Sequence, residues 1–286
     1  MRILLPAKAL LFCALLAALT GCSITQAMRV ENREVIDVKT MIGELRGSPL
    51  VFLGERHDAS AHHELQLDIL KALKAEGKPL AIGMEMFEDS SQRALDAWSA
   101  GKVPENAFRK VFAWNWRNIP WGLYRDIMIY ARDHSIPIVA LNAPREVVQA
   151  VSRKGFSSLT PEQLKLLPLG INAEVTDTYL QFMMSFYPMH GRNGEAFRNI
   201  SEAQMLRNRV MARRISDYQQ LHPETVMVVI AGGGHARQKG GIPAELGKLP
   251  YKIVLPPIPA LNSDTVTTKD ADYLLVEPFS WLADML

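Results

Sequence analysis

Cysteine is scarce in this chain of 286 residues, which contains only Cys13 and Cys22. Two cysteines so close to the amino terminus cannot form a disulfide framework for the body of the protein. The chain also lacks a strong excess of either charge, because it has 32 basic and 30 acidic residues. Nucleic-acid binding needs a basic surplus or stripe, so that class is excluded. No Gly-X-Y period or sustained heptad is present, which excludes collagen-like and coiled-coil proteins.

Residues 1–21 have the features of a lipoprotein signal peptide. Arg2 and Lys8 precede the apolar run ALLFCALLAAL, which is shorter than the ~20 residues that span a bilayer. The run leads into the motif LTGC, which resembles a bacterial lipobox and would make Cys22 the acylated, palmitate-bearing first residue of the mature chain. An ordinary secretory peptide or a core helix is the alternative. Ser23 resembles an outer-membrane sorting residue, so we expect a lipid-anchored protein of the bacterial cell envelope, at the outer membrane.

The rest of the chain predicts one α/β domain. Residues 22–47 are polar and predict a tether with a short helix, whereas residues 48–286 alternate between short apolar runs and helical patterns. This alternation is typical of a mostly parallel sheet with helices on both faces. Residues 160–221 contain consecutive helices without a strand, an excursion that we interpret as a cap, dimer surface or ligand lid. We predict strands at 49–53, 80–86, 136–141, 225–230, 251–255 and 273–276, and helices at 59–76, 90–100, 122–133 and after Pro144.

Polar residues follow four of these predicted strands. The carboxyl ends of parallel strands meet at one edge of a sheet, where ligands gather. We therefore expect these side chains to share one site. The glycine run 232–234 lacks the Lys-Ser/Thr of a P-loop, which argues against a nucleotide. The strand-end residues are Glu55, His57, Glu85, Asn142, Arg145 and His235.

Two of these residues also suggest a metal. His57 and His235, with Glu55 or Glu85, would supply the two-histidine, one-carboxylate set of a zinc, iron or manganese site. Such an ion lowers the pKa of bound water, and a glutamate then acts as base in a metal-dependent hydrolase. The alternative is that each histidine is a structural, hydrogen-bonded residue.

Two further histidines open the helix after the first main strand. The three- and four-residue spacing places His62 on the face that points toward the sheet, as a supporting residue rather than a ligand. His63 follows about a hundred degrees around the helix. We therefore expect His63 at the surface.

The segment TDTYLQFMMSFYPM, residues 176–189, has apolar side chains on two faces of a helix. Tyr179, Met183 and Phe186 share one face, so the helix packs between core and neighbour, lies at a dimer interface, or forms the wall for a large flat ligand. Tyr187 is next to the proline that ends the helix. A phenolate oxygen can ligate ferric haem iron. Two polar residues would complete a haem pocket, His190 beside that tyrosine and Arg207 on the next helix, opposite a propionate or, alternatively, in solvent.

Four motifs together resemble a known family. They are GERHD (54–58), GMEMF (83–87), NAPR (142–145) and AGGGHA (231–236), and their order and placement after strands are similar to those of the ChaN-type iron-regulated lipoproteins. That family belongs to the haem-binding-uptake and Tiki-like superfamily. The similarity spans roughly residues 48–255, and the lipobox agrees with it independently.

The resemblance implies a membrane-anchored protein that binds haem, two haems lying face to face across a homodimer. It implies a tyrosine ligand, which we place at Tyr187 with Tyr179 as the alternative. Its partners would be components of a haem-uptake receptor or transporter. The superfamily also contains metal-dependent hydrolases, whose positions would here be Glu55, His57, Glu85 and His235. We expect a haem-binding protein rather than an enzyme.

Overall fold

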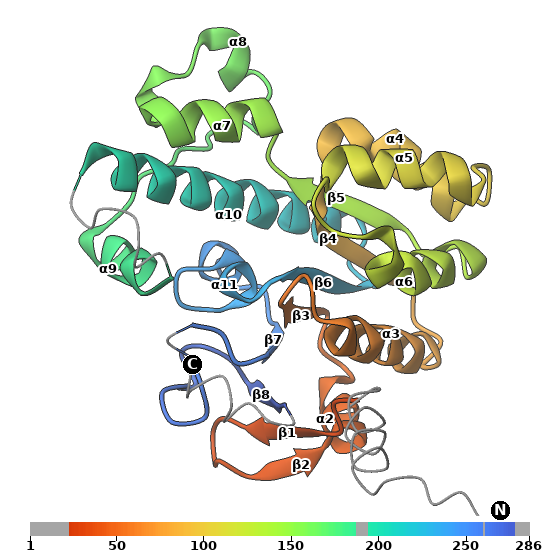
Figure 1. Cartoon of the computed structure of the whole chain (residues 1–286). Helices are drawn as coiled ribbons and strands as arrows, with labels where there is room; N and C mark the ends of the chain where they lie inside the picture. Colours follow the sequence, from red (N-terminus) through yellow and green to blue (C-terminus); the bar gives the residue numbers. More distant parts are fainter. Residues whose placement is uncertain (1–22, 187–193, 260, 278–286) are drawn as a thin grey trace, which may run out of the picture.

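The computed structural model describes residues 23–186, 194–259 and 261–277, and within them the strands form a single sheet (Figure 1). Its strand order is β2-β1-β8-β7-β3-β6-β4-β5. The strands are β1 (Gln26–Arg29), β2 (Val35–Asp37), β3 (Leu50–Glu55), β4 (Leu80–Glu88), β5 (Ile138–Asn142), β6 (Val226–Gly232), β7 (Lys252–Leu255) and β8 (Tyr273–Val276).

Every pairing from β8 to β5 is parallel, and only β1 pairs antiparallel with its neighbours. The central strands are buried along nearly their whole length, because helices cover both faces. The prediction of a mostly parallel α/β sheet is confirmed. The longer helices are α2 (Val38–Leu45), α3 (Ser60–Lys74), α4 (Gln92–Ser99), α5 (Glu105–Asn115), α6 (Trp121–Asp133), α7 (Arg145–Lys154), α9 (Asp177–Phe186) and α10 (Glu195–Leu221).

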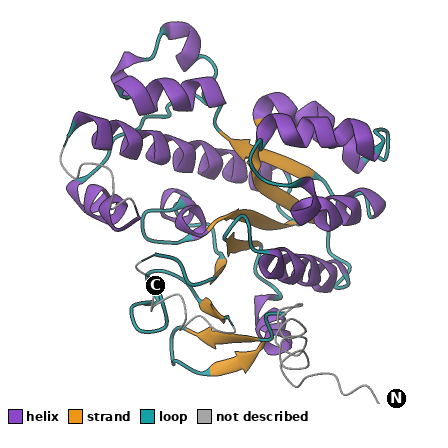
Figure 2. Cartoon of the chain, viewed as in Figure 1, coloured by secondary structure: helices purple, strands orange, loops and turns teal. Residues whose placement is uncertain are grey.

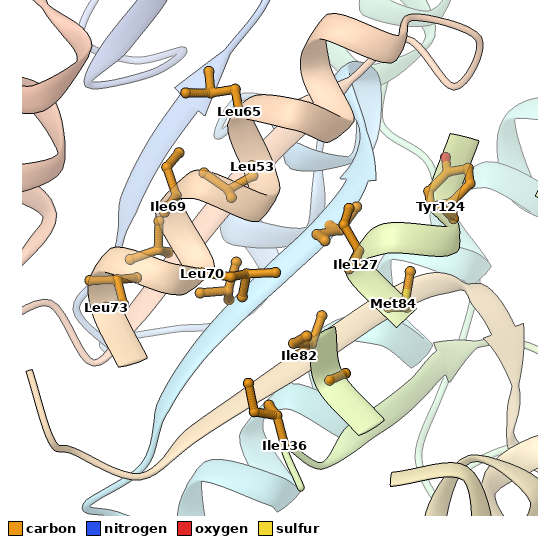
Figure 3. Close-up of a cluster of buried hydrophobic side chains, with 14 of the residues drawn as sticks. Leu53, Leu65, Ile69, Leu70, Leu73, Ile82, Met84, Tyr124, Ile127 and Ile136 are labelled. Atoms are coloured by element: carbon orange, nitrogen blue, oxygen red, sulfur yellow. The ribbon is translucent and has the colours of Figure 1, made fainter. Parts of the chain in front are cut away.

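The two faces of the sheet have separate cores. Successive strand residues point to opposite faces, so Leu53 packs with helices α3 to α6 and Phe52 packs with α10. Figure 2 shows helices on both sides of the strands. Figure 3 shows part of the first core, where Ile69 and Leu70 of α3 lie beside Leu53. Apolar packing on both faces therefore holds the central strands, and the residues at their carboxyl ends, in fixed positions.

Where residues 160–221 are described, they contain successive helices joined by turns and loops and no strand, as the sequence predicts. A short helix, α8 (Pro161–Leu164), is followed by α9 and by the long α10. Helix α9 lies against the amino-terminal part of α10 (Figure 1). Its own small core joins Tyr179 and Met183 to Phe197 and Met205 of α10.

Residues 26–37 correct the prediction of a tether. They form β1 and β2, and β1 joins the sheet through β8. Ala27, Met28 and Ile36 are the buried residues of these two strands, a pattern too short to be recognised in the sequence. The helix predicted nearby exists as α2. None of the described helices combines the length and apolar character that crossing a membrane would need.

Candidate functional site

The polar strand ends of β3, β4 and β6 meet at one edge of the sheet, as the sequence predicts, whereas Asn142 and Arg145, at and just after the end of β5, line a neighbouring cavity. A cavity of about 350 Å³ opens there beneath α9. Glu55 ends β3, Glu85 lies near the end of β4, and His235 lies on the short helix α11 (Gly233–Ala236) after β6. Volumes of this order are typical of small-molecule sites. Lining residues include Glu55, His57, Glu85, Trp116, Tyr179, Phe182, Met183, Arg207, Asn208 and His235.

Glu55 is a buried carboxylate surrounded by donors. Its oxygens lie 2.8 Å from His57 Nδ1 and 2.7 Å from Gln66 Nε2, and the hydroxyl of Tyr124 donates to it as well. His63 Nδ1 is 3.3 Å away. Burial raises the pKa of Glu55, but hydrogen bonds from the two histidines outweigh burial and lower it to about 2. Glu55 is therefore ionised and orients His57.

Glu85 is a second buried carboxylate with different partners. One oxygen lies 2.5 Å from Arg207 Nη2, and the other accepts the backbone N–H of Gly232 at 2.7 Å. His235 Nε2 is 3.8 Å from it. Burial raises the pKa of Glu85, but the nearby His235, Arg207 and His57 lower it to about 2.

The two cavity histidines have opposite pKa shifts. Burial lowers the pKa of His57, but the hydrogen bond that it donates to Glu55 and the charge of Glu85 raise it above its usual value. Burial lowers the pKa of His235 to about 4 despite Glu85, with Arg207 acting in the same direction as burial. His235 Nδ1 lies 2.6 Å from Asn208 Oδ1. Near neutral pH, His57 therefore holds a proton more readily than His235 does.

The donor set does not fit a resident metal. In the part of the chain that the structure describes, no three His, Cys, Asp or Glu side chains are grouped to hold an ion. The guanidinium of Arg207 already pairs with Glu85, and Glu55 already accepts from several donors. A divalent cation would have to displace these bonds and lie beside a fixed positive charge. The predicted zinc, iron or manganese site at His57 and His235 is not supported.

The two histidines of α3, His62 and His63, are buried next to the residues of the site. His62 is buried as predicted, and its Nε2 lies 2.8 Å from Glu277 Oε1. The surface position predicted for His63 is wrong, because only 3% of this residue is exposed. Its ring lies between Gln66 and the backbone carbonyl of His57. Helical spacing alone missed His63 because α6 covers that side of α3 as well.

Three supporting residues were missed by sequence reasoning. Tyr124 on α6 bonds Glu55, Asn208 on α10 bonds His235, and the ring of Trp116 lies edge-on to His57 at 4.9 Å. The aromatic density around 114–124 is a visible signal, but it also fits plain core packing. Nothing in the sequence distinguishes Asn208 from other polar residues of α10.

Helix α9 forms the apolar wall of the cavity. Tyr179 and Met183 are buried and line it together with Phe182. Phe182 is held in place by the guanidinium of Arg237, 4.9 Å from its ring centre, and by Gly240, where a Cβ would lie 2.7 Å from the ring. The side chain of Phe186, and the whole of Tyr187 and His190, lie outside the described residues.

The arginines of α10 pair within the protein. Arg207 bonds Glu85 and Asn142, the latter at 3.1 Å. Arg209, Arg213 and Arg214 pair with Glu245, Asp217 and Asp89 respectively. Arg207 lines the predicted pocket, but its charge is already balanced by Glu85.

Comparison with protein families identifies the class of this molecule. The chain belongs to the family described as haem-binding uptake, Tiki superfamily, ChaN, whose model matches residues 41–246. The ChaN-type resemblance seen in the sequence is therefore confirmed. Comparison with curated proteins finds no significant match.

Solved structures show the same fold. One, titled "Cofacial heme binding to ChaN of Campylobacter jejuni", has a TM-score of 0.69 at 20% identity and covers 88% of this chain and 96% of its own. The type III effector HopBA1 has a TM-score of 0.51 at 14% identity, covering 89% of this chain and 97% of its own. At such identities the likeness shows the α/β fold that the two proteins share with this chain.

Proposed function

We propose that the protein binds haem in the cavity beneath α9, as a component of haem-iron uptake. The observation that carries the proposal is the apolar wall of Tyr179, Phe182 and Met183 over a cavity at the sheet edge. A porphyrin is a large flat apolar ligand, and such a wall buries its face. Family membership supports the same ligand.

The iron would be held by a tyrosine, since a phenolate oxygen is a strong ligand for ferric haem. Tyr187 is the proposed ligand and Tyr179 the alternative. Tyr179 lines the cavity and is 6% exposed. Met183 would pack against the macrocycle, and Phe186 and His190 are proposed to complete the pocket.

A haemin titration of the chain from Ser23 onward tests this function. We expect saturable binding of one haem per chain and the charge-transfer bands of ferric tyrosinate haem. Tyr187→Phe should abolish those bands, while Tyr179→Phe and the distant control Tyr218→Phe should keep them. If only Tyr179→Phe removes the bands, the ligand is Tyr179. If haemin binds no better than to an unrelated protein, the function is wrong.

We also propose that Cys22 anchors the protein to the outer membrane and that two copies form a homodimer with their haems face to face. The Campylobacter jejuni structure, whose title describes cofacial haem binding, supports the pairing. A haem receptor or transporter component would exchange the ligand with the dimer. Cys22→Ala should move the protein from the membrane to the soluble fraction. Sedimentation should show dimers that form on haem loading.

A second candidate function is hydrolysis without a metal. It is favoured by the opposite pKa shifts of His57 and His235 in one cavity, a pattern that defines an acid and a base. His235 would accept a proton from water, and His57 would donate one to the leaving group.

Chelator-treated protein and a nitrophenyl ester test this second function. Activity should rise with pH as His235 loses its proton, near its pKa of about 4, and fall as His57 loses its own. His235→Asn should reduce the rate at least ~10²-fold, whereas the exposed control His134→Asn should not. If the wild-type protein hydrolyses the ester no faster than His235→Asn does, this candidate function is eliminated.

A further inference from the structure

A second, smaller cavity of about 170 Å³ lies at the carboxyl ends of β4 and β5. Trp116 and Arg207 line both this cavity and the larger one, so the two are neighbours. The small cavity is the place where Asn142 and Arg145 of the NAPR motif meet. Neither the haem wall nor the acid–base pair uses Arg145.

The guanidinium of Arg145 is held by the backbone rather than by an acid. Its Nη2 donates to the carbonyl oxygens of Trp114 at 3.0 Å and Asn115 at 2.7 Å. Among the side chains that the structure describes, no carboxylate forms an ion pair with it. A guanidinium has five N–H donors in a planar fork, so donors remain for an anionic partner. Arg145 is therefore a positioned cation without a counter-charge.

The neighbouring Trp116 also has an unpaired donor. The indole Nε1 of Trp116 is buried and has no hydrogen-bond partner among the described residues. An indole nitrogen only donates, so the missing partner is an acceptor. Buried donors without partners are rare in native proteins. Because this nitrogen has almost no accessible surface, Trp116 lines the small cavity without offering it this donor.

The acidic groups near the cavity are already bonded. Glu88 Oε2 accepts from the backbone N of Arg145 at 2.7 Å, and its Oε1 accepts from Ser90 Oγ at 3.0 Å. Its charge thus lies at the amino terminus of α7, where the helix dipole stabilises it. The charge of Arg207 is balanced by Glu85. Arg145 remains as the cation available to a ligand.

We propose that the small cavity binds a carboxylate, and that this carboxylate is a side arm of the ligand held in the larger cavity. The proposal rests on the proposed haem function, because the propionates of haem are such arms. The cavity is smaller than typical sites for whole ligands, which start near ~300 Å³, but a short arm needs far less room. Arg145 binds the carboxylate oxygens through its free N–H groups.

Haemin and the dimethyl ester of the same iron porphyrin test the assignment. The ester keeps the flat ring and iron but has no carboxylate charge. The wild-type protein should bind haemin at least ~10-fold more tightly than the ester, as expected for a charge-assisted hydrogen bond. Arg145→Gln should weaken haemin binding by a similar factor and bind both ligands equally. The matched control Arg153→Gln, at the exposed end of the same helix, should behave like the wild type.

Several outcomes would overturn the proposal. If the wild type binds haemin and the ester equally, the carboxylate site is wrong while the haem function stands. If it binds neither, the haem function itself fails. Sodium propionate alone, followed by tryptophan fluorescence with Trp116→Phe as the blank, separates the sources of the carboxylate. Saturation by millimolar propionate without weakening of haemin binding would assign the cavity to a free small acid instead of a haem arm.

Arg145→Lys guards against a folding artefact. It keeps the charge but loses the planar fork, so it should fold normally and recover part of the preference for haemin. A lysine variant that discriminates no better than Arg145→Gln, with an unchanged melting temperature for both, would contradict a role for the charge.

Discussion

The guanidinium of Arg207 lies 2.5 Å from a carboxylate oxygen of Glu85, although 122 positions separate the two residues in the chain. Arg207 stands on α10 and Glu85 on β4, so the bond ties the helical excursion to the sheet. Arg207 also lines both cavities, whereas Glu85 lines the larger one. Because Glu85 is almost wholly buried, its charge depends on this partner.

Removing that partner should destabilise the fold. We expect Arg207→Gln to lower the free energy of unfolding by about 3–5 kcal/mol, because a buried carboxylate loses its counter-charge. Urea unfolding measures the change. Arg213→Gln is the matched control, since Arg213 pairs with Asp217 on the exposed side of the same helix and should cost less than about 1 kcal/mol. Equal losses in the two variants would contradict a special role for the buried pair.

Glu55 should make stability depend on acid pH. Its folded pKa of about 2 lies below the ordinary 4.5, so the unfolded chain binds its proton first as pH falls. The contribution is therefore complete above pH 4.5 and is lost as pH falls toward 2. Glu55→Gln should lose about 3 kcal/mol at pH 7, and the gap to wild type should narrow below pH 4.5. Glu146→Gln, on an exposed position of α7, should show no such convergence.

The stabilisation that His57 gives through its bond with Glu55 should decrease as the pH rises. The pKa of His57 is raised in the folded protein, so its contribution is present below the unfolded pKa and is lost as pH rises through the folded one. We expect His57→Gln to be less stable than the wild type at pH 6. The difference in stability should shrink as the pH rises through the folded pKa of His57. Thermal unfolding from pH 5 to 9 measures this. A difference that is constant with pH would show that His57 stabilises by packing alone.

Much of the fold could be predicted because the central strands are unbroken apolar runs. Residues 80–86 and 225–230 are buried on both faces, so their hydrophobicity alone marks them. The short strands β1 and β2 have only one or two buried residues each. Strand β1 joins the sheet by pairing with β8 near the other end of the chain, and β2 pairs with β1. The local sequence does not indicate such a long-range contact.

The position of the site could be predicted from the sequence, but the hydrogen bonds and ion pairs within it could not. The strand-end rule places Glu55, Glu85 and His235 together because all three follow parallel strands. It does not say that Arg207 pairs with Glu85, since that depends on where α10 crosses the sheet. The buried position of His63 depends likewise on a helix from elsewhere in the chain. Contacts between elements decide which polar residues pair.

Replacing glycine by alanine should have opposite effects on stability at two positions, Gly241 and Gly122. A Cβ on Gly241 would lie 2.0 Å from the carbonyl oxygen of Arg237, a contact that backbone cannot relieve without moving. Gly122, in helix α6, has nothing within 4 Å of its Cβ position. We expect Gly241→Ala to cost more than about 3 kcal/mol and Gly122→Ala to add about 0.4–1 kcal/mol, since alanine restricts the unfolded chain. Melting temperatures of both variants check the pair.

Phe182 should control how firmly α9 covers the larger cavity. Its ring packs between Arg237 and Gly240 and, together with Tyr179 and Met183, attaches α9 to the body. Phe182→Ala should therefore loosen α9 locally, by about 2–4 kcal/mol, while the sheet remains intact. Hydrogen exchange should become faster in α9 and stay unchanged in β3 and β6. Gln181→Ala, exposed on the same helix, is the control; equal protection of α9 in both variants would mean that Tyr179 and Met183 hold the wall without Phe182.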